Sequence, residues 1–314
     1  MTPAPQTIPR TNLIVILGPT ASGKTCLAVE TARRLNGEII SADSRQVYCG
    51  MDIGTGKDLQ EYGNTPYHLI DIVAPGYEFN VYEFQQRFYT AFSDICARGH
   101  IPVLCGGTGL YLEAVLSSYR MVEAPPDMAL RARLSDLSTL ELRQELLRLK
   151  PEQHNNTDLE ERERVIRAIE ITLAQKNTEP TADIPEIFPL IFGLRWERPV
   201  LRQRIKTRLY QRLEQGMLAE VQHLHDNGAS WETLEFYGLE YRFIAQYLQG
   251  QISYPDMVEK LGNAICKFAK RQETWFRRME KRGTCINWLN PEAEPTKHLL
   301  QVYRDYIFIR SDPA

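Results

Sequence analysis

Leu13-Ile-Val-Ile-Leu-Gly-Pro-Thr-Ala-Ser-Gly-Lys-Thr25 contains the strongest indication of fold class in this chain. Its first part, Leu13–Leu17, is a continuous apolar run, which is typical of a buried parallel strand. The second part, Gly18–Thr25, matches the pattern G-x-x-x-x-G-K-[ST] at every fixed position. Apolar residues then recur at helical spacing in Lys24–Leu35 and stop at Asn36-Gly37. Strand, glycine-rich turn and helix in this order predict a P-loop in an α/β fold.

A P-loop predicts a binding site for a diphosphate. Glycines let backbone N–H groups converge on phosphate oxygens, and the helix N-terminus adds a favourable dipole. Lys24 supplies a cation, and the Thr25 hydroxyl can ligate Mg²⁺. The residues expected at the diphosphate are Gly18, Pro19, Thr20, Ala21, Ser22, Gly23, Lys24 and Thr25.

The P-loop does not decide the reaction. By itself it is typical of ATP-binding and other nucleotide-binding proteins, so a small-molecule kinase stays open. A nucleotide-hydrolysing switch is disfavoured, because the sequence has no N-K-x-D motif and no long strand ending in Asp-Glu.

Strand and helix patterns alternate on both sides of a helical stretch. Further strands are expected at Glu38–Ala42, His68–Val73, Ile101–Cys105 and Phe188–Leu194, with a short edge strand at Val302–Ile309. Helices are expected at Phe79–Arg98, from about Leu110, within Leu130–Leu149 and Val165–Leu173, and after Pro199. This order predicts a parallel sheet flanked by helices. We expect a P-loop core at 1–118 and 187–314, with helices at its C-terminal end, and a helical insertion at 119–186 that contacts its macromolecular partner.

Composition sets the class of protein and leaves the partner open. The chain has 314 residues, of which 43% are apolar and 25% charged, as in an ordinary globular protein. Its net charge of −3 does not exclude a local basic patch. The six cysteines are scattered without a C-x-x-C pair, which predicts a reduced compartment and hence the cytoplasm. No apolar run approaches the roughly 18 residues that span a bilayer, so no membrane association is expected.

Asp43 is the second candidate for chemistry. It follows the expected strand Glu38–Ala42, at the carboxyl edge where open α/β sheets bind ligands. A carboxylate there can accept a proton from an attacking nucleophile or hold Mg²⁺ through water. The alternative is a turn former or helix cap.

Several further motifs follow the P-loop in a fixed order. They are Ile40–Tyr48 (ISADSRQVY), Met51–Thr55 (MDIGT), His68–Asp71 (HLID), Gly106–Tyr111 (GGTGLY), Arg164–Glu170 and Lys270–Trp275 (KRQETW). Together with the P-loop, this ordered set resembles the tRNA dimethylallyltransferase (tRNA isopentenyltransferase) family from about Leu13 to Arg282. The family transfers a dimethylallyl group from dimethylallyl diphosphate to the exocyclic amine of adenosine at tRNA position 37, next to the anticodon, and releases pyrophosphate.

The resemblance implies roles for residues that match the family's motifs. It implies a tRNA anticodon stem-loop and dimethylallyl diphosphate as partners, Mg²⁺ as cofactor at Thr25, and a monomer. The implied catalytic residues are Asp43, Lys24, Thr25 and Arg131, with Asp43 as the base that receives the amine hydrogen. The implied tRNA-binding residues are Asp43, Ser44, Arg45, Gln46, Thr108, Arg131, Glu163, Arg164, Arg167, Tyr241, Arg242, Lys270, Arg271, Gln272, Thr274, Trp275 and Arg277.

Three positions depart from the family's pattern. Gly56 replaces the alanine that more often precedes the lysine of its turn, and Glu240 stands where many members have glycine in Gly-Tyr-Arg. Asn156–Asp158 is a variant of the usual Asn-Asp motif. These departures concern the fine contacts with tRNA and not the chemistry.

A cluster of cations near the C-terminal end allows two interpretations. Its members are Lys267, Lys270, Arg271, Arg277, Arg278, Lys281 and Arg282, interleaved with Phe268, Trp275 and Phe276. Steps of three and four place many of these cations on one helical face, which suits phosphates, and nearby aromatics can stack bases. The alternative is a solvated amphipathic helix whose aromatics belong to the core. The arginines of the insertion allow the same two interpretations.

Three other functions compete with a tRNA prenyltransferase. A prenyltransferase for free adenine nucleotides shares the chemistry but needs neither the insertion nor the basic helix. A P-loop kinase would use ATP as a phosphoryl donor. A non-catalytic RNA-binding or nucleotide-sensing module is disfavoured by the complete P-loop and Asp43.

Overall fold

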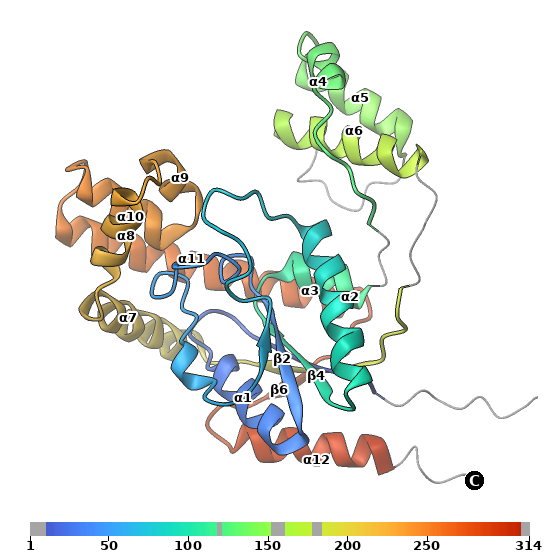
Figure 1. The fold of residues 1–314 in the computed structure, drawn as a ribbon, viewed down its shortest axis with the longest axis vertical. Helices are drawn as coiled ribbons and strands as arrows, with labels where there is room; N and C mark the ends of the chain where they lie inside the picture. The colour runs from blue at the N-terminus through green and yellow to red at the C-terminus, as the bar shows by residue number, and fades with distance from the viewer. Residues whose placement is uncertain (1–10, 118–120, 152–160, 178–183, 309–314) are drawn as a thin grey trace, which may run out of the picture. The chain divides into compact units, whose positions relative to one another are not determined.

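The computed structural model describes residues 11–117, 121–151, 161–177 and 184–308 (Figure 1). The chain divides into two compact units. The core unit comprises Met1–Ser117 and Pro185–Ala314, and the insertion unit comprises Ser118–Ile184. No helix in the described ranges is long and apolar enough to cross a membrane.

A parallel sheet forms the centre of the core unit. Its strands are β1 (Leu13–Leu17), β2 (Gly37–Ala42), β3 (Tyr67–His68), β4 (Ile101–Gly106), β5 (Pro189–Leu194) and β6 (Asn287–Leu289). They pair in the order β3-β2-β4-β1-β5-β6, and every pairing is parallel. All residues of β1 are buried, as expected for a strand covered by helices on both faces. The predicted P-loop parallel sheet flanked by helices is confirmed.

Helices cover this sheet and form the C-terminal region. Before the insertion lie α1 (Lys24–Leu35), the short 3₁₀ helix η1 (Leu59–Glu61), α2 (Val81–Ala97) and α3 (Gly109–Leu116). After it lie α7 (Arg198–Glu214), α8 (Met217–Asp226), α9 (Trp231–Phe236), α10 (Leu239–Leu248), α11 (Tyr254–Lys281) and α12 (Pro295–Phe308). Buried residues of α7, α8, α10 and α11 share one hydrophobic cluster, so these helices pack together beside the sheet.

The insertion unit has its own small core. Its helices are α4 (Met128–Leu134), α5 (Thr139–Leu149) and α6 (Arg162–Asn177). Their apolar faces bury Leu130, Leu134, Leu142, Leu146, Val165, Ile166 and Ile169 together. A capping box between Ser138 and Glu141 begins α5. The helical character predicted for this stretch is confirmed.

Two predicted strands are wrong in extent or in kind. His68–Val73 continues β3 only at His68, because Leu69 (φ 63°) and Asp71 (φ 55°) adopt left-handed conformations that end the extended chain. Val302–Ile309 was expected to be an edge strand, but it is helical through Phe308, and Ile309 lies outside the described residues. Leu299 and Leu300 of the same helix, α12, are buried in one cluster with residues of α1. Helix α12 lies beside α1 (Figure 1), and β6 occupies the sheet edge instead.

Glu38 in β2 anchors a charged cluster in the core unit. Its side chain is only 4% exposed and contacts His68 Nε2 (2.7 Å), Arg98 Nη2 (2.8 Å) and His100 Nδ1 (2.5 Å). Burial alone would raise the pKa of Glu38, but hydrogen bonds from these three side chains lower it to about 2.

We expect Glu38→Gln to lower the free energy of unfolding by about 2 kcal/mol at pH 7, because it removes charge-assisted hydrogen bonds. A carboxyl whose folded-state pKa is lowered stabilises the protein above its unfolded-state pKa and loses this contribution as pH falls toward the folded-state value. The difference between wild type and variant should therefore shrink as pH falls from about 4.5 toward 2. Urea unfolding at pH 7, 5, 4 and 3 measures it, and a pH-independent difference would contradict the ionic origin.

Candidate active site

The P-loop connects β1 to α1. Ala21 (φ 61°) and Gly23 (φ 89°) both adopt the left-handed conformation. Between them the chain closes a turn in which Ser22 N donates to Pro19 O (3.2 Å). Backbone that alternates in this way directs successive N–H groups into one concavity, which suits an anion. The structure thus brings the predicted residues Gly18–Thr25 into one loop at the N-terminus of α1.

Asp43 and the P-loop leave the sheet at the same edge. Gly106 of β4 is the register partner of both Leu17 in β1 and Ala42 in β2. Gly18 follows Leu17, Asp43 follows Ala42 and Gly107 follows Gly106. The loops that leave β1, β2 and β4 therefore begin side by side. The predicted proximity of Asp43 to the P-loop therefore follows directly from the strand register.

Hydrogen bonds hold the Asp43 turn. Asp43 Oδ1 accepts from Arg45 N (2.9 Å), and Ser44 N donates to Thr108 Oγ1 (3.2 Å). Thr108 N donates in turn to Ala42 O (3.3 Å). These contacts order the backbone on both sides of the Asp43 carboxylate, which is half-buried.

Gln272 of α11 ties the P-loop to the loop after β4. Its Oε1 accepts from Thr20 N (2.8 Å), and its Nε2 donates to Gly107 O (2.9 Å). The side chain is buried. The predicted contact of Gln272 with tRNA stays a prediction, while these bonds indicate that the amide positions two loops of the site.

The surroundings of Lys24 are strongly charged. Burial lowers the pKa of its ammonium, and Asp43 opposes this effect as a nearby opposite charge. The like charges of Arg208 and Arg212 in α7 lower the Lys24 pKa further. The neighbouring Cys105 is buried, and burial raises the pKa of its thiol to about 12.

A pocket adjoins the P-loop on the side of α7. It is lined by Thr20 and Ala21 from the loop, Ile205, Arg208, Leu209 and Arg212 from α7, Met217 from α8, Glu240 from α10 and Ile265 from α11. Its walls therefore combine apolar surface with two arginines. Sequence analysis missed both arginines. The recurrence of arginine every four residues at Arg204, Arg208 and Arg212, on one face of a helix, was a signal that could have found them.

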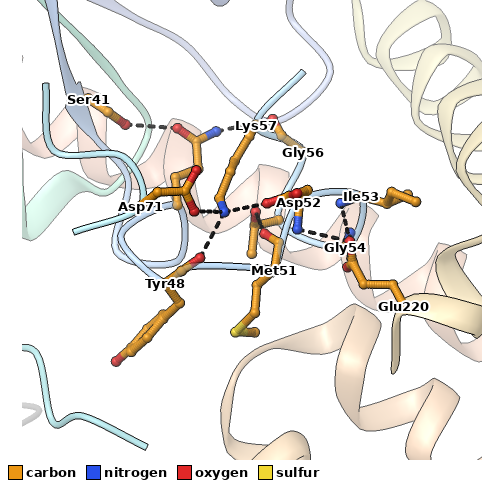
Figure 2. Close-up of polar contacts among 12 residues, drawn as sticks. Ser41, Tyr48, Met51, Asp52, Ile53, Gly54, Gly56, Lys57, Asp71 and Glu220 are labelled. Carbon is orange, nitrogen blue, oxygen red and sulfur yellow. Dashed lines mark hydrogen bonds and ion pairs between the residues drawn. The ribbon is translucent and has the colours of Figure 1, made fainter. Parts of the chain in front are cut away.

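The turn after Asp43 is anchored by a buried lysine (Figure 2). Lys57 Nζ donates to Tyr48 O (2.8 Å) and pairs with Asp52 Oδ1 (2.5 Å) and with Asp71. Its side chain is completely buried, so the two carboxylates compensate its charge. Sequence analysis did not identify Lys57, because its partners only meet it in the folded chain.

Glu220 of α8 binds the backbone just before this lysine. Its carboxylate accepts from the N–H groups of Asp52 (2.9 Å), Ile53 (2.7 Å) and Gly54 (2.9 Å), as Figure 2 shows. The Tyr241 hydroxyl also donates to Glu220 Oε1 (2.7 Å). Tyr241 is 1% exposed, and its expected contact with tRNA stays a prediction that its burial does not favour.

The side chain of Gln46 forms hydrogen bonds within the protein. It accepts from Ser41 Oγ (2.8 Å) and donates to Gly56 O (3.1 Å). Arg45 and Arg242, by contrast, lie toward the surface. The Arg45 guanidinium lies 5.5 Å from the centroid of Phe236, a ring that is 67% exposed, and Arg242 Nε donates to Glu235 O (3.2 Å).

The residues of the basic face of α11 fit in part an RNA-binding surface and in part an amphipathic helix whose aromatics belong to the core. Lys270, Arg271, Thr274 and Arg277 are exposed or half-buried, as a phosphate-binding face requires. Phe276 is completely buried and belongs to the core. Outside this set, Arg278 stacks on Trp275 (3.9 Å to the ring centroid), and Arg278 and Arg282 both pair with Glu113 of α3.

The insertion unit places its predicted residues around a buried carboxylate. Glu170 accepts from Arg131 Nε (2.7 Å) and Arg167 Nη1 (3.0 Å). Arg164 pairs with Glu161 (3.1 Å), and Glu163 is exposed. The contacts of Arg131 with the diphosphate, and of all four residues with tRNA, stay predictions. The variant motif Asn156–Asp158 lies outside the described residues.

A magnesium ion would need the substrate's own oxygens. Within the described ranges, no three His, Cys, Asp or Glu side chains converge as metal ligands. Thr25 lies in the first turn of α1, directly after the P-loop glycines, where its hydroxyl fits the one or two protein ligands that Mg²⁺ takes beside phosphates and water. The residues present therefore fit a metal held mainly by a bound diphosphate.

Comparisons with known proteins agree on one family. The family model for IPP transferase matches residues 46–279, and that for isopentenyl transferase matches residues 11–64. The chain is 61% identical over 293 residues to tRNA dimethylallyltransferase 1 of Geotalea uraniireducens, covering 93% of this chain and 97% of the relative. It is 57% identical over 296 residues to tRNA dimethylallyltransferase 2 of Shewanella sediminis, covering 94% and 98%.

Solved structures give the same result. The tRNA isopentenylpyrophosphate transferase of Bacillus halodurans is similar with a TM-score of 0.70 and 32% identity, covering 96% of this chain and 98% of that one. A eukaryotic dimethylallyltransferase captured acting on tRNA has a TM-score of 0.77 and 25% identity, covering 96% and 80%. Sequence motifs, sheet order and these similarities together show that the chain belongs to the tRNA dimethylallyltransferase family.

Proposed function

We propose that this protein transfers a dimethylallyl group from dimethylallyl diphosphate to the exocyclic amine of adenosine at tRNA position 37, releasing pyrophosphate. The observation that carries this proposal is the shared register partner Gly106, which sets Asp43 beside the P-loop. An anion site and a carboxylate at one sheet edge suit a reaction in which a diphosphate leaves while a nucleophile loses a proton.

The residues have distinct roles in this reaction. The P-loop N–H groups and Lys24 bind the diphosphate, whose negative charge grows as the allylic C–O bond breaks and the electron pair leaves with pyrophosphate. The adenine nitrogen forms the new C–N bond, and Asp43 accepts the proton that this nitrogen loses. A bound Mg²⁺ supplies additional positive charge to the diphosphate oxygens.

The tRNA would bind through exposed cations of the core unit. Arg45, Arg242, Lys270, Arg271 and Arg277 all lie toward solvent or at half-buried positions, where they can reach phosphates. Adenosine must leave its stack to reach a carbon held at the P-loop, and a loop permits this at lower cost than a duplex. Ser44 and Thr108, which adjoin Asp43, would line the base pocket. Arg131, Glu163, Arg164 and Arg167 of the insertion unit would add contacts to the anticodon stem-loop.

The test is a transfer assay with defined tRNA. The protein is incubated with dimethylallyl diphosphate, Mg²⁺ and an unmodified tRNA that carries adenosine at position 37, and nucleosides are analysed by mass spectrometry. The control tRNA carries guanosine at that position. Prenylated adenosine only in the first sample supports the proposal, and a product from free adenosine monophosphate without tRNA would favour a nucleotide prenyltransferase.

A monomeric state and a cytoplasmic location stay predictions from the resemblance and from the cysteine pattern.

Reversing two charges on α11 tests the tRNA face. We expect Lys270→Glu with Arg271→Glu to weaken tRNA binding and to reduce the slope of log K against log salt by about 1.5, because two phosphate contacts are lost. Filter binding at several salt concentrations measures this slope. The matched control is Lys297→Glu with Arg304→Glu on α12, which changes the net charge equally at exposed positions. Equal slopes for both double variants would refute α11 as the RNA-binding face.

A further inference from the structure

Arg212 is a buried arginine that the proposed reaction has not yet used. It lies in α7, is 8% exposed, and lines the pocket beside Thr20 and Ala21 of the P-loop. Its Nε is buried and makes no hydrogen bond to any residue in the described ranges. A buried guanidinium with an unpaired donor is costly, so a site that keeps one is expected to provide a partner in another state.

The acidic neighbours of Arg212 compensate it only in part. Asp58 Oδ2 lies 3.9 Å from Arg212 Nη2, whereas Arg208 contacts the same oxygen more closely. Glu240 also lines the pocket, but burial raises the pKa of its carboxyl, with Arg212 opposing this effect. Among the described residues, Asp58 is the carboxylate that forms ion pairs with both arginines, and Arg212 Nε stays without a partner, so a further anion can be accommodated.

The chain is adapted locally to this guanidinium. A Cβ at Gly56 would lie 1.5 Å from Arg212 Nη2 and 2.5 Å from its Cζ. A side chain at position 56 would therefore displace the guanidinium, so the turn leaves space for it.

The anion that fits is a diphosphate. Arg208 and Arg212 line one pocket with Thr20 and Ala21 of the P-loop, and their like charges lower the pKa of the Lys24 ammonium. A guanidinium presents a planar fork of N–H donors that matches phosphate oxygens. Apolar residues of the same pocket limit water there, which strengthens such contacts.

We propose that Arg212, together with Arg208, binds a phosphate of the allylic diphosphate and of the pyrophosphate product at the mouth of the P-loop. This inference rests on the proposed function, because that function supplies the diphosphate. The alternative is a structural role in which Arg212 only holds Asp58 and the turn around Gly56. The structural role predicts an effect on stability without an effect on diphosphate affinity.

The test measures binding of inorganic pyrophosphate with Mg²⁺ and without tRNA, by calorimetry. We expect Arg212→Met to weaken binding by about 10- to 100-fold, the loss expected for hydrogen bonds to a charged group. Arg212→Gln, which is also uncharged, is measured in parallel so that a folded variant is available, as checked by circular dichroism. The matched control is Arg202→Met, an exposed arginine of α7, which should bind within twofold of wild type.

Two outcomes separate the inferences. If wild type transfers dimethylallyl to tRNA and a folded Arg212 variant binds pyrophosphate within twofold of wild type, Arg212 is not a diphosphate ligand. The other outcome has two parts: wild type binds pyrophosphate and the Arg212 variants do not, but wild type transfers no dimethylallyl group to tRNA. In that case the Arg212 assignment stands and the proposed function fails. As a second readout, the variants should raise KM for dimethylallyl diphosphate and leave KM for tRNA unchanged.

Discussion

Asp43→Asn is expected to lower kcat for dimethylallyl transfer by about 10²- to 10⁴-fold, the usual contribution of a positioned general base. Asparagine keeps the side-chain oxygen that accepts from Arg45 N at 2.9 Å, so the turn should persist while the proton acceptor is lost. Affinity for pyrophosphate should stay within twofold of wild type, because the P-loop is untouched.

Single-turnover kinetics with saturating tRNA measures this change. The control is Asp94→Asn on α2, an equivalent substitution at a carboxylate that is 57% exposed and pairs with Arg98. The assignment of Asp43 as the base is rejected if Asp43→Asn turns over at a rate near that of wild type.

The second large effect is expected at Lys57. Lys57→Met should lower the free energy of unfolding by about 3 kcal/mol, because removal of a buried lysine leaves Asp52 and Asp71 without their shared partner. Both carboxylates are partly exposed, at 53% and 32%, so water relieves some of the cost and we expect the lower end of the usual range.

Urea unfolding at pH 7 measures the change, with Lys297→Met on α12 as control. Lys297 is 78% exposed and pairs with Glu294, so its loss should change stability by less than about 0.5 kcal/mol. A loss below about 1 kcal/mol at Lys57 would show that the buried ion pairs offset little more than their own desolvation.

Prediction from sequence worked best where the signal is local. Leu13–Leu17 and Lys24–Leu35 were predicted with the bounds that the structure has, because an apolar run and a helical repeat are each read within one segment. The placement of Asp43 at a sheet edge was also predictable, since the residue after a parallel strand lies at the carboxyl edge.

Prediction from sequence failed where contacts with other segments determine whether a residue run forms a strand or a helix. His68–Val73 looks like a strand by composition, yet two left-handed residues end it at His68. Val302–Ile309 has aromatic and β-branched residues that also suit a helix against α1, and the sheet edge was taken by the shorter β6. A strand as short as Asn287–Leu289 has too few residues for a periodic signal.

By itself, the amino-acid sequence determined the P-loop, the parallel α/β class and the family, because these depend on residue order along short segments. Only the tertiary structure decided which contacts distant side chains make near the site. Gln272 reaches Thr20 across 252 residues, and the guanidinium of Arg212 fills the space that glycine leaves at position 56. Such contacts have no periodicity or spacing along the chain, because they arise only when separate helices pack against the loops of the sheet.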